Sequence, residues 1–181
     1  GWSPMVTDDK LYIGDYAGLV YCLNATTGAL IWKSANTGGV NYGMTAVADV
    51  AVGDRRIYLG GTHTDVICLN DTGGVEWRYN TGGTVWNVLV ADGKVYAGSQ
   101  DGKVYCLDAT TSTLIWTYTR PIAAYARSAL SVHGDRLFFA SQDKNVTCVN
   151  KNTGAFIWNY TTGGTFGYQS GPYISGDGKV I

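Results

Sequence analysis

The stretch VYCLDATTSTLIW, residues 104–116, decides the fold because its pattern returns along the chain. It reads as a strand, a polar bend and a second strand that ends in tryptophan. Three further segments align with it: YCLNATTGALIW, ICLNDTGGVEW and TCVNKNTGAFIW. Their tryptophans, at positions 32, 77, 116 and 158, are separated by 45, 39 and 42 residues. A repeat of this period indicates units that stack on one another rather than a local cofactor site.

Each unit contains four short strands. In the third unit we expect strands at 84–91, 94–99, 103–108 and 113–118, with hairpin turns at Asp92–Gly93 and Asp101–Gly102. No segment shows helical periodicity. A four-stranded antiparallel meander repeated every 40 or so residues is typical of one blade of a β-propeller. The sequence therefore predicts an all-β propeller.

Alignment of the repeats gives the domain organisation. The blades are predicted at 1–39, 40–83, 84–122 and 123–164, and residues 165–181 match the start of a fifth. The chain is thus a single propeller domain or a propeller fragment. We expect either a longer propeller, of which this chain is a piece, or an eight-bladed ring that two copies close as a homodimer; a closed four-bladed monomer is the alternative.

Composition excludes two classes of partner. Charged residues make up only 15% of the chain, and the formal net charge is −1, so nothing favours nucleic-acid binding. No apolar run approaches the roughly 18 residues that a membrane-spanning helix requires.

The repeated residues suit packing between blades. The tryptophans are the large flat residues and the cysteines the small ones, and we expect both sets to dock blade against blade: Trp32, Trp77, Trp116, Trp158, Cys22, Cys68, Cys106 and Cys148. With one cysteine per blade, the spacing offers neither the close pairs of a disulfide framework nor a zinc cluster. Buried free thiols are the prediction.

The pattern Cys22-x-Asn24-x-x-Thr27-Gly28-x-x-x-Trp32 resembles the tryptophan-docking motif of the PQQ-like, or quinoprotein-type, β-propeller repeat family. The resemblance covers essentially the whole chain, although that family usually has Ala in place of Cys22 and Asp in place of Asn24. It implies that the tryptophan of one blade stacks on the Thr-Gly peptide of its neighbour. The family includes quinoprotein alcohol dehydrogenases, a bacterial outer-membrane assembly lipoprotein, sensor domains and archaeal surface proteins.

The resemblance also implies which residues a cofactor-binding member of the family would have. Members that use the quinone have a calcium site of Glu, Asn and Asp and a disulfide between neighbouring cysteines, and this chain has no adjacent cysteine pair. His63 and His133 fall in different blades, and no nucleophile-elbow sequence frames a serine. We therefore expect no cofactor, no metal and no enzymatic activity, but a scaffold for protein or ligand interaction. The alternative is a fragment of a quinoprotein dehydrogenase whose cofactor site lies outside this chain.

The innermost strands differ from copy to copy, and their ends form the mouth of the channel. Candidate binding residues there are Asn41, Tyr42, Trp86, Asn87, Tyr125, Arg127, Tyr168 and Gln169. Aromatic rings beside amides and an arginine suit a protein, a small ligand or a glycan; the competing interpretation is that they only fill and solvate the channel.

Four Asn-x-Thr sequons occur, at Asn24, Asn70, Asn145 and Asn159. Asn24 and Asn70 occupy the same bend in successive blades. This pattern favours an extracytoplasmic or cell-surface protein.

Overall fold

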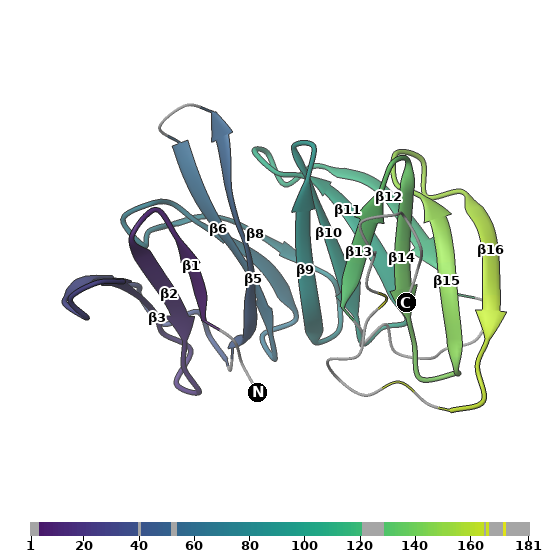
Figure 1. Cartoon of the computed structure of the whole chain (residues 1–181), viewed down its shortest axis with the longest axis horizontal. Coiled ribbons are helices and arrows are strands. Elements are labelled where there is room, and N and C mark those ends of the chain that lie inside the picture. Colours follow the sequence, from purple (N-terminus) through teal and green to yellow (C-terminus); the bar gives the residue numbers. More distant parts are fainter. Residues whose placement is uncertain are drawn as a thin grey trace.

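The structure is a computed structural model that describes residues 4–39, 41–51, 54–120 and 129–164 and the single residues 166 and 172; within 41–51 it describes the backbone only. These residues form sixteen strands and no helix. The strands belong to four antiparallel four-stranded sheets, each continuous in chain order (Figure 1). The predicted all-β fold of four-stranded blades is confirmed.

The strands of the first sheet are β1 (Met5–Thr7), β2 (Lys10–Gly14), β3 (Val20–Asn24) and β4 (Leu30–Lys33). Those of the second are β5 (Asn41–Ala51), β6 (Asp54–Gly61), β7 (Asp65–Leu69) and β8 (Val75–Asn80). Those of the third are β9 (Val85–Ala91), β10 (Lys94–Ser99), β11 (Lys103–Asp108) and β12 (Leu114–Thr119). Those of the fourth are β13 (Leu130–His133), β14 (Arg136–Ala140), β15 (Asn145–Asn150) and β16 (Phe156–Thr161).

Tight turns with positive φ set the register of the hairpins. Between β9 and β10, Asp92 and Gly93 have φ angles of 51° and 69°, and the strands pair directly from Ala91 and Lys94 onward. Two successive positive φ angles are those of a type I′ turn, whose twist matches that of the paired strands. The Asp-Gly signal in the sequence therefore fixes this hairpin.

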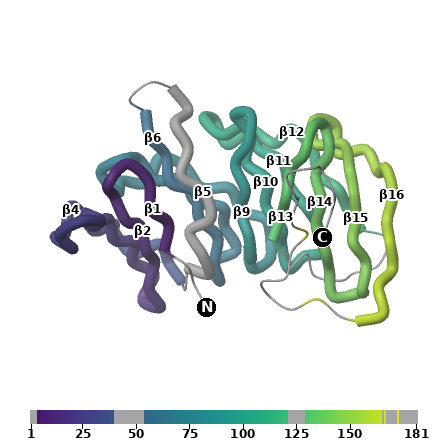
Figure 2. The backbone as a smooth tube through the Cα atoms, in the orientation of Figure 1, coloured from purple at the N-terminus to yellow at the C-terminus, as the bar shows by residue number. Residues whose placement is uncertain are grey.

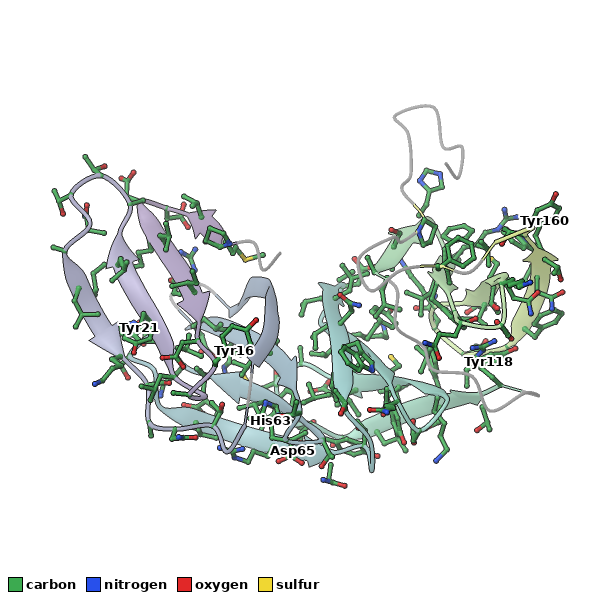
Figure 3. All side chains as sticks on the ribbon, turned by 90° about the horizontal axis from the view of Figure 1, so that it is seen from below. Tyr16, Tyr21, His63, Asp65, Tyr118 and Tyr160 are labelled. Carbon is green, nitrogen blue, oxygen red and sulfur yellow. The ribbon has the colours of Figure 1, made fainter. Side chains whose placement is uncertain are left out.

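The four sheets follow one another along an open arc, from the purple sheet to the yellow-green one (Figure 3), and Figure 2 traces the chain along it. The first strands of successive sheets contact one another: β1 with β5, β5 with β9, and β9 with β13. These strands are therefore the inner ones, and β4, β8, β12 and β16 are the outer ones. Over the described residues the four sheets do not close into a ring (Figure 3), an arrangement consistent with part of a propeller.

Three hydrophobic clusters lie between successive sheets. The first joins Tyr12 and Val20 to Ile57 and Leu59, and equivalent clusters fill the next two interfaces. Because the middle sheets are covered on both faces, their central strands are almost continuously buried: the last five residues of β10 all are. This explains why Val95, Tyr96 and Ala97 follow one another in β10 without alternating with polar residues.

The four sheets lie within the four predicted blade ranges, while the predicted fifth unit falls almost entirely outside the described residues. The blade boundaries remain a prediction. No helix in the described ranges is long and apolar enough to cross a membrane.

Candidate functional site

Each sheet carries a row of three side chains on its second, third and fourth strands, in the order aromatic, cysteine, tryptophan. In the first sheet, Tyr12 on β2 pairs with Cys22 on β3, which pairs with Trp32 on β4. The two rings meet beside the small cysteine, with centroids 6.0 Å apart. The same row recurs in the other sheets as Tyr58–Cys68–Trp77, Tyr96–Cys106–Trp116 and Phe138–Cys148–Trp158.

Sequence reasoning missed the first aromatic residue of this row. Its four positions, 12, 58, 96 and 138, are separated by 46, 38 and 42 residues, the same spacings as those of the cysteines. The periodicity was therefore present in the sequence. It is harder to see because the chain has 13 tyrosines, most of them outside the row.

The polar loop between the third and fourth strands of each sheet is held by an asparagine or aspartate. Asn24 Oδ1 accepts hydrogen bonds from the backbone N–H groups of Thr26 and Thr27, and Gly28, at φ 72°, donates to the Asn24 carbonyl. Asp108 does the same in the third sheet, where Ser112 takes the place of glycine at φ 60°. The Ser112 N–H still donates to the Asp108 carbonyl, at 3.0 Å, so this loop keeps the same turn despite the serine.

Across each interface, the tryptophan ring lies against the loop of the next sheet. A Cβ atom added at Gly154 would lie 2.8 Å from two atoms of the Trp116 ring. Trp116 Nε1 donates to the Lys151 carbonyl at 3.0 Å, and Tyr96 Oη donates to the same oxygen at 3.2 Å. The row of the third sheet is thus joined to the fourth sheet by one carbonyl with two donors.

The preceding interface repeats this arrangement. Trp77 Nε1 and Tyr58 Oη both donate to the carbonyl of Ala109, at 3.2 and 3.0 Å. Ala109 is fully buried, so these two donors supply the hydrogen bonds that its carbonyl oxygen cannot obtain from water.

The first interface differs because the receiving loop is one residue shorter. Gly73 donates to the carbonyl three residues before it, Asn70, whereas Gly28 and Gly154 donate to a carbonyl four residues back. The Trp32 ring still lies against the loop, 2.7 Å from a Cβ placed at Gly73. Its Nε1, like Tyr12 Oη, is buried and reaches no loop carbonyl. Burial raises the pKa of Tyr12, and the nearby Arg55 guanidinium offsets only part of that rise.

Each cysteine lies in the same sheet as its tryptophan and beside it, so it does not face that indole across the interface. The small residue across the interface is a loop glycine, Gly73 for Trp32 and Gly154 for Trp116. All four thiols are buried and free. Burial raises the pKa of Cys68 to about 11 and that of Cys106 to about 12, so both stay protonated and act as small apolar side chains. Whether these rows and loops fix one blade to the next is a prediction, which the variants below test.

Of the eight candidate residues at the channel mouth, four lie on described inner strands. Trp86 and Asn87 are half-buried on β9, and Asn41 and Tyr42 are at the start of β5, where only the backbone is described. The others lie outside the described residues: Tyr125, Arg127, Tyr168 and Gln169. The site as a whole therefore remains a prediction.

The two histidines lie apart, as the sequence predicts. Burial lowers the pKa of His63, whose Nδ1 accepts a hydrogen bond from the backbone N–H of Asp65 (Figure 3). His133 is exposed at the end of β13. Over the described part of the chain, no three His, Cys, Asp or Glu side chains gather as metal ligands. Because each cysteine lies in its own sheet, the described residues do not supply the disulfide between neighbouring cysteines that the quinone-using proteins have.

Comparison with known proteins places this geometry in a family. The family described as outer membrane protein assembly factor BamB, one of PQQ-like repeats, matches residues 1–47 and 16–172. The chain belongs to this PQQ-like repeat family. The BamB of Moraxella catarrhalis has a similar structure, with a TM-score of 0.72 over 88% of this chain and 48% of that one at 16% identity. The PQQ-like repeat resemblance seen in the sequence is confirmed.

Proteins similar to this chain bear different names. Outer membrane protein assembly factor BamB of Nitrosomonas eutropha is 26% identical over 139 residues, which is 75% of this chain and 32% of the relative. Tetrathionate hydrolase of Acidithiobacillus ferrooxidans is 32% identical over 111 residues, 60% of this chain and 20% of the relative. The chain thus spans a third or less of these relatives. The BamB name refers to the outer membrane, which fits the predicted extracytoplasmic or cell-surface location.

Proposed function

We propose that the chain is a non-catalytic part of a β-propeller that binds protein partners during outer membrane protein assembly. The observation that carries this proposal is the match to the outer membrane protein assembly factor family over nearly the whole chain. The repeated side chains also support it, because they are engaged in packing between sheets. Partner recognition is then left to residues that differ from one sheet to the next.

The channel mouth is the proposed binding surface. The inner strand β5, which begins with Asn41 and Tyr42, is in contact with the inner strand β9, which carries Trp86 and Asn87. Aromatic residues are enriched at protein interfaces and often dominate their binding energy. A protein segment is therefore favoured over a small ligand or a glycan as the occupant.

A binding titration tests the proposal. A fluorescently labelled outer membrane protein, unfolded in urea and diluted into buffer, is titrated with the chain while its anisotropy is recorded. We expect saturable binding, weakened at least about tenfold, or 1.4 kcal/mol, by Trp86→Ala and by Arg127→Ala. The matched control is Tyr160→Ala, which removes an aromatic ring that is 67% exposed on the outer strand β16 (Figure 3). Equal binding by all three variants, each shown to be folded by urea unfolding, contradicts this choice of surface.

The enzymatic alternative has its own test. Titration of the chain with the quinone and calcium, followed by visible absorption, is expected to give no stoichiometric complex. A one-to-one complex would favour a quinoprotein fragment instead.

Ring closure by a second copy also stays a prediction. A solution mass of twice 19.4 kDa supports the eight-bladed homodimer, and a mass of 19.4 kDa at micromolar concentration contradicts it.

A further inference from the structure

The interface between the third and fourth sheets departs from the repeat at the end of the outer strand. In the other three sheets a threonine hydroxyl there donates to a backbone carbonyl: Thr37 to Gly18, Thr81 to Thr64 and Thr162 to Lys144. Arg120 occupies this place in the third sheet. Its guanidinium is buried and donates to the Asp143 carboxylate of the fourth sheet.

The fourth sheet also differs from the third at the residue that precedes the cysteine. In the third sheet, the residue before Cys106 is Tyr105, whose hydroxyl lies 2.5 Å from Asp101 Oδ2 and 2.8 Å from the Thr81 carbonyl oxygen, so that either can accept its one proton. Its ring meets Tyr79 of the preceding sheet edge-on, with centroids 5.9 Å apart. Tyr21 makes the corresponding bond to Asp15 in the first sheet, at 3.0 Å. A phenol beside an aspartate thus occurs in the first and third sheets, whereas Ile67 stands at this place in the second.

In the fourth sheet the tyrosine is replaced by Thr147. The adjacent strand compensates in part, because Phe139 stands opposite Thr147 where Ala97 stands opposite Tyr105. Phe139 meets the Tyr118 ring edge-on at 5.8 Å, so the inner part of the interface keeps its aromatic contact. A space remains further out in this interface, and Thr147, which is 3% exposed, touches it.

That space is a cavity of about 420 Å³. The residues that line it include Tyr118, Arg120, Asp143, Thr147, Phe156 and Asn159. Tyr118 corresponds to Tyr79 and Asp143 to Asp101, so the cavity has the same neighbours as the Tyr105 phenol one interface earlier. An apolar cavity of roughly 150 Å³ accommodates a benzene ring in another protein. The larger space here has room for a phenol and part of the group that carries it.

The carboxylate in the cavity is prepared to accept a further hydrogen bond. Burial raises the pKa of Asp143, but hydrogen bonds from Ser141 and Asn145 and the Arg120 charge outweigh it and hold the pKa below its usual value. The carboxylate is therefore ionised. Ser141 Oγ and the Asn145 N–H donate to Oδ1, whereas Arg120 donates to Oδ2. An ionised carboxylate has about four acceptor sites, so Oδ2 can accept one more donor.

We propose that this cavity binds a phenol ring, with its hydroxyl donating to Asp143 Oδ2 and its ring beside Tyr118. The template is Tyr105, which makes these contacts within the preceding interface. The site lies among outer strands and is therefore distinct from the proposed channel mouth. Its ligand is a small phenol or a tyrosine side chain of another protein.

Nuclear magnetic resonance titration of the ¹⁵N-labelled chain with 4-methylphenol tests the proposal. We expect saturable shifts at residues 118–120 and 143–147 with a millimolar Kd, since so small a ligand makes few contacts. Toluene, which lacks the hydroxyl, is expected to bind about tenfold more weakly because it cannot donate to the carboxylate. No saturable shift there, or equal affinity for the two ligands, would overturn the proposal.

Variants at Thr147 provide the structural control. Thr147→Tyr is expected to fill the cavity, abolish 4-methylphenol binding and raise the melting temperature, whereas Thr147→Val, of nearly the same volume, retains binding within twofold. Thr147→Leu is a second blocking variant if the tyrosine variant does not fold. Binding that survives in the folded blocking variant contradicts the site. The peptides Gly-Tyr-Gly and Gly-Phe-Gly then distinguish a tyrosine side chain from a free phenol as the ligand. If the site accepts tyrosine side chains of other proteins, Gly-Tyr-Gly binds and Gly-Phe-Gly binds more weakly; if it accepts only small phenols, neither peptide binds.

Discussion

Removing the hydroxyl of Tyr96 tests how the aromatic rows join successive sheets. Tyr96 is fully buried, and its hydroxyl donates to the Lys151 carbonyl across the interface. Tyr96→Phe deletes this bond but leaves the carbonyl its second donor, Trp116. We expect the free energy of unfolding to fall by about 1 kcal/mol, the usual net value of such a bond. Tyr58→Phe, which deletes the equivalent bond to Ala109, should cost about the same.

Tyr12→Phe is the matched control. Tyr12 is equally buried in the same row, but its hydroxyl reaches no carbonyl of the shorter loop that follows. We expect a loss of less than half that of Tyr96→Phe. The assay is urea unfolding followed by tryptophan fluorescence and circular dichroism. Equal losses for Tyr12, Tyr58 and Tyr96, or none for any of them, would refute the reasoning.

A double variant sharpens the result. Tyr58→Phe combined with Trp77→Phe removes both donors from the Ala109 carbonyl and leaves a buried acceptor unsatisfied. An unsatisfied buried group costs about 1–3 kcal/mol, so the double variant should lose more than the sum of the single losses. Strict additivity would mean that the shared carbonyl does not couple the two rings.

Three further predictions concern single residues. Ser112→Gly should stabilise the chain by about 0.5 kcal/mol in urea unfolding, because serine at φ 60° is strained and glycine is not, less the entropy that glycine adds to the unfolded state; destabilisation would show that the serine side chain is required. Since burial lowers the pKa of His63, the unfolded state binds more protons, and stability should fall as the pH drops below about 6.5. His63→Asn should flatten that decline, and an unchanged profile would exclude His63 as its cause. None of the four thiols should react rapidly with a disulfide reagent before unfolding, whereas fast reaction of one would show that it is accessible.

Much of the fold was predictable because the repeat encodes it several times over. The tryptophan and cysteine spacings define the period, and Asp92–Gly93 fixes a hairpin by a purely local rule. The third-unit strands predicted at 94–99 and 103–108 match β10 and β11; β9 begins one residue later than predicted, and β12 begins and ends one residue later. Turn-forming residues and a repeated pattern of buried residues can both be recognised in a single sequence.

The partners across each interface were not predictable in the same way. Nothing in the sequence near Trp116 shows that its indole N–H meets the Lys151 carbonyl, because that contact depends on how two sheets are placed. The cavity beside Thr147 follows from a compensating change on a neighbouring strand, at Phe139. Only comparison of the repeats in three dimensions shows that the aromatic ring lies at Phe139 in the fourth sheet instead of at the position of Thr147, and that a cavity lies beside it.

The central claim is that the indole of one sheet docks on the loop of the next, and two glycines test it most directly. Gly28 and Gly154 have the same φ, 72°, and the same turn, but only at Gly154 would an added methyl group lie within 4 Å of an indole, that of Trp116. Alanine costs about 1–2 kcal/mol at either site for the backbone alone. The account predicts that Gly154→Ala loses about 1–3 kcal/mol more than Gly28→Ala in urea unfolding, because the methyl group collides with the ring. Equal losses for the two variants would contradict it.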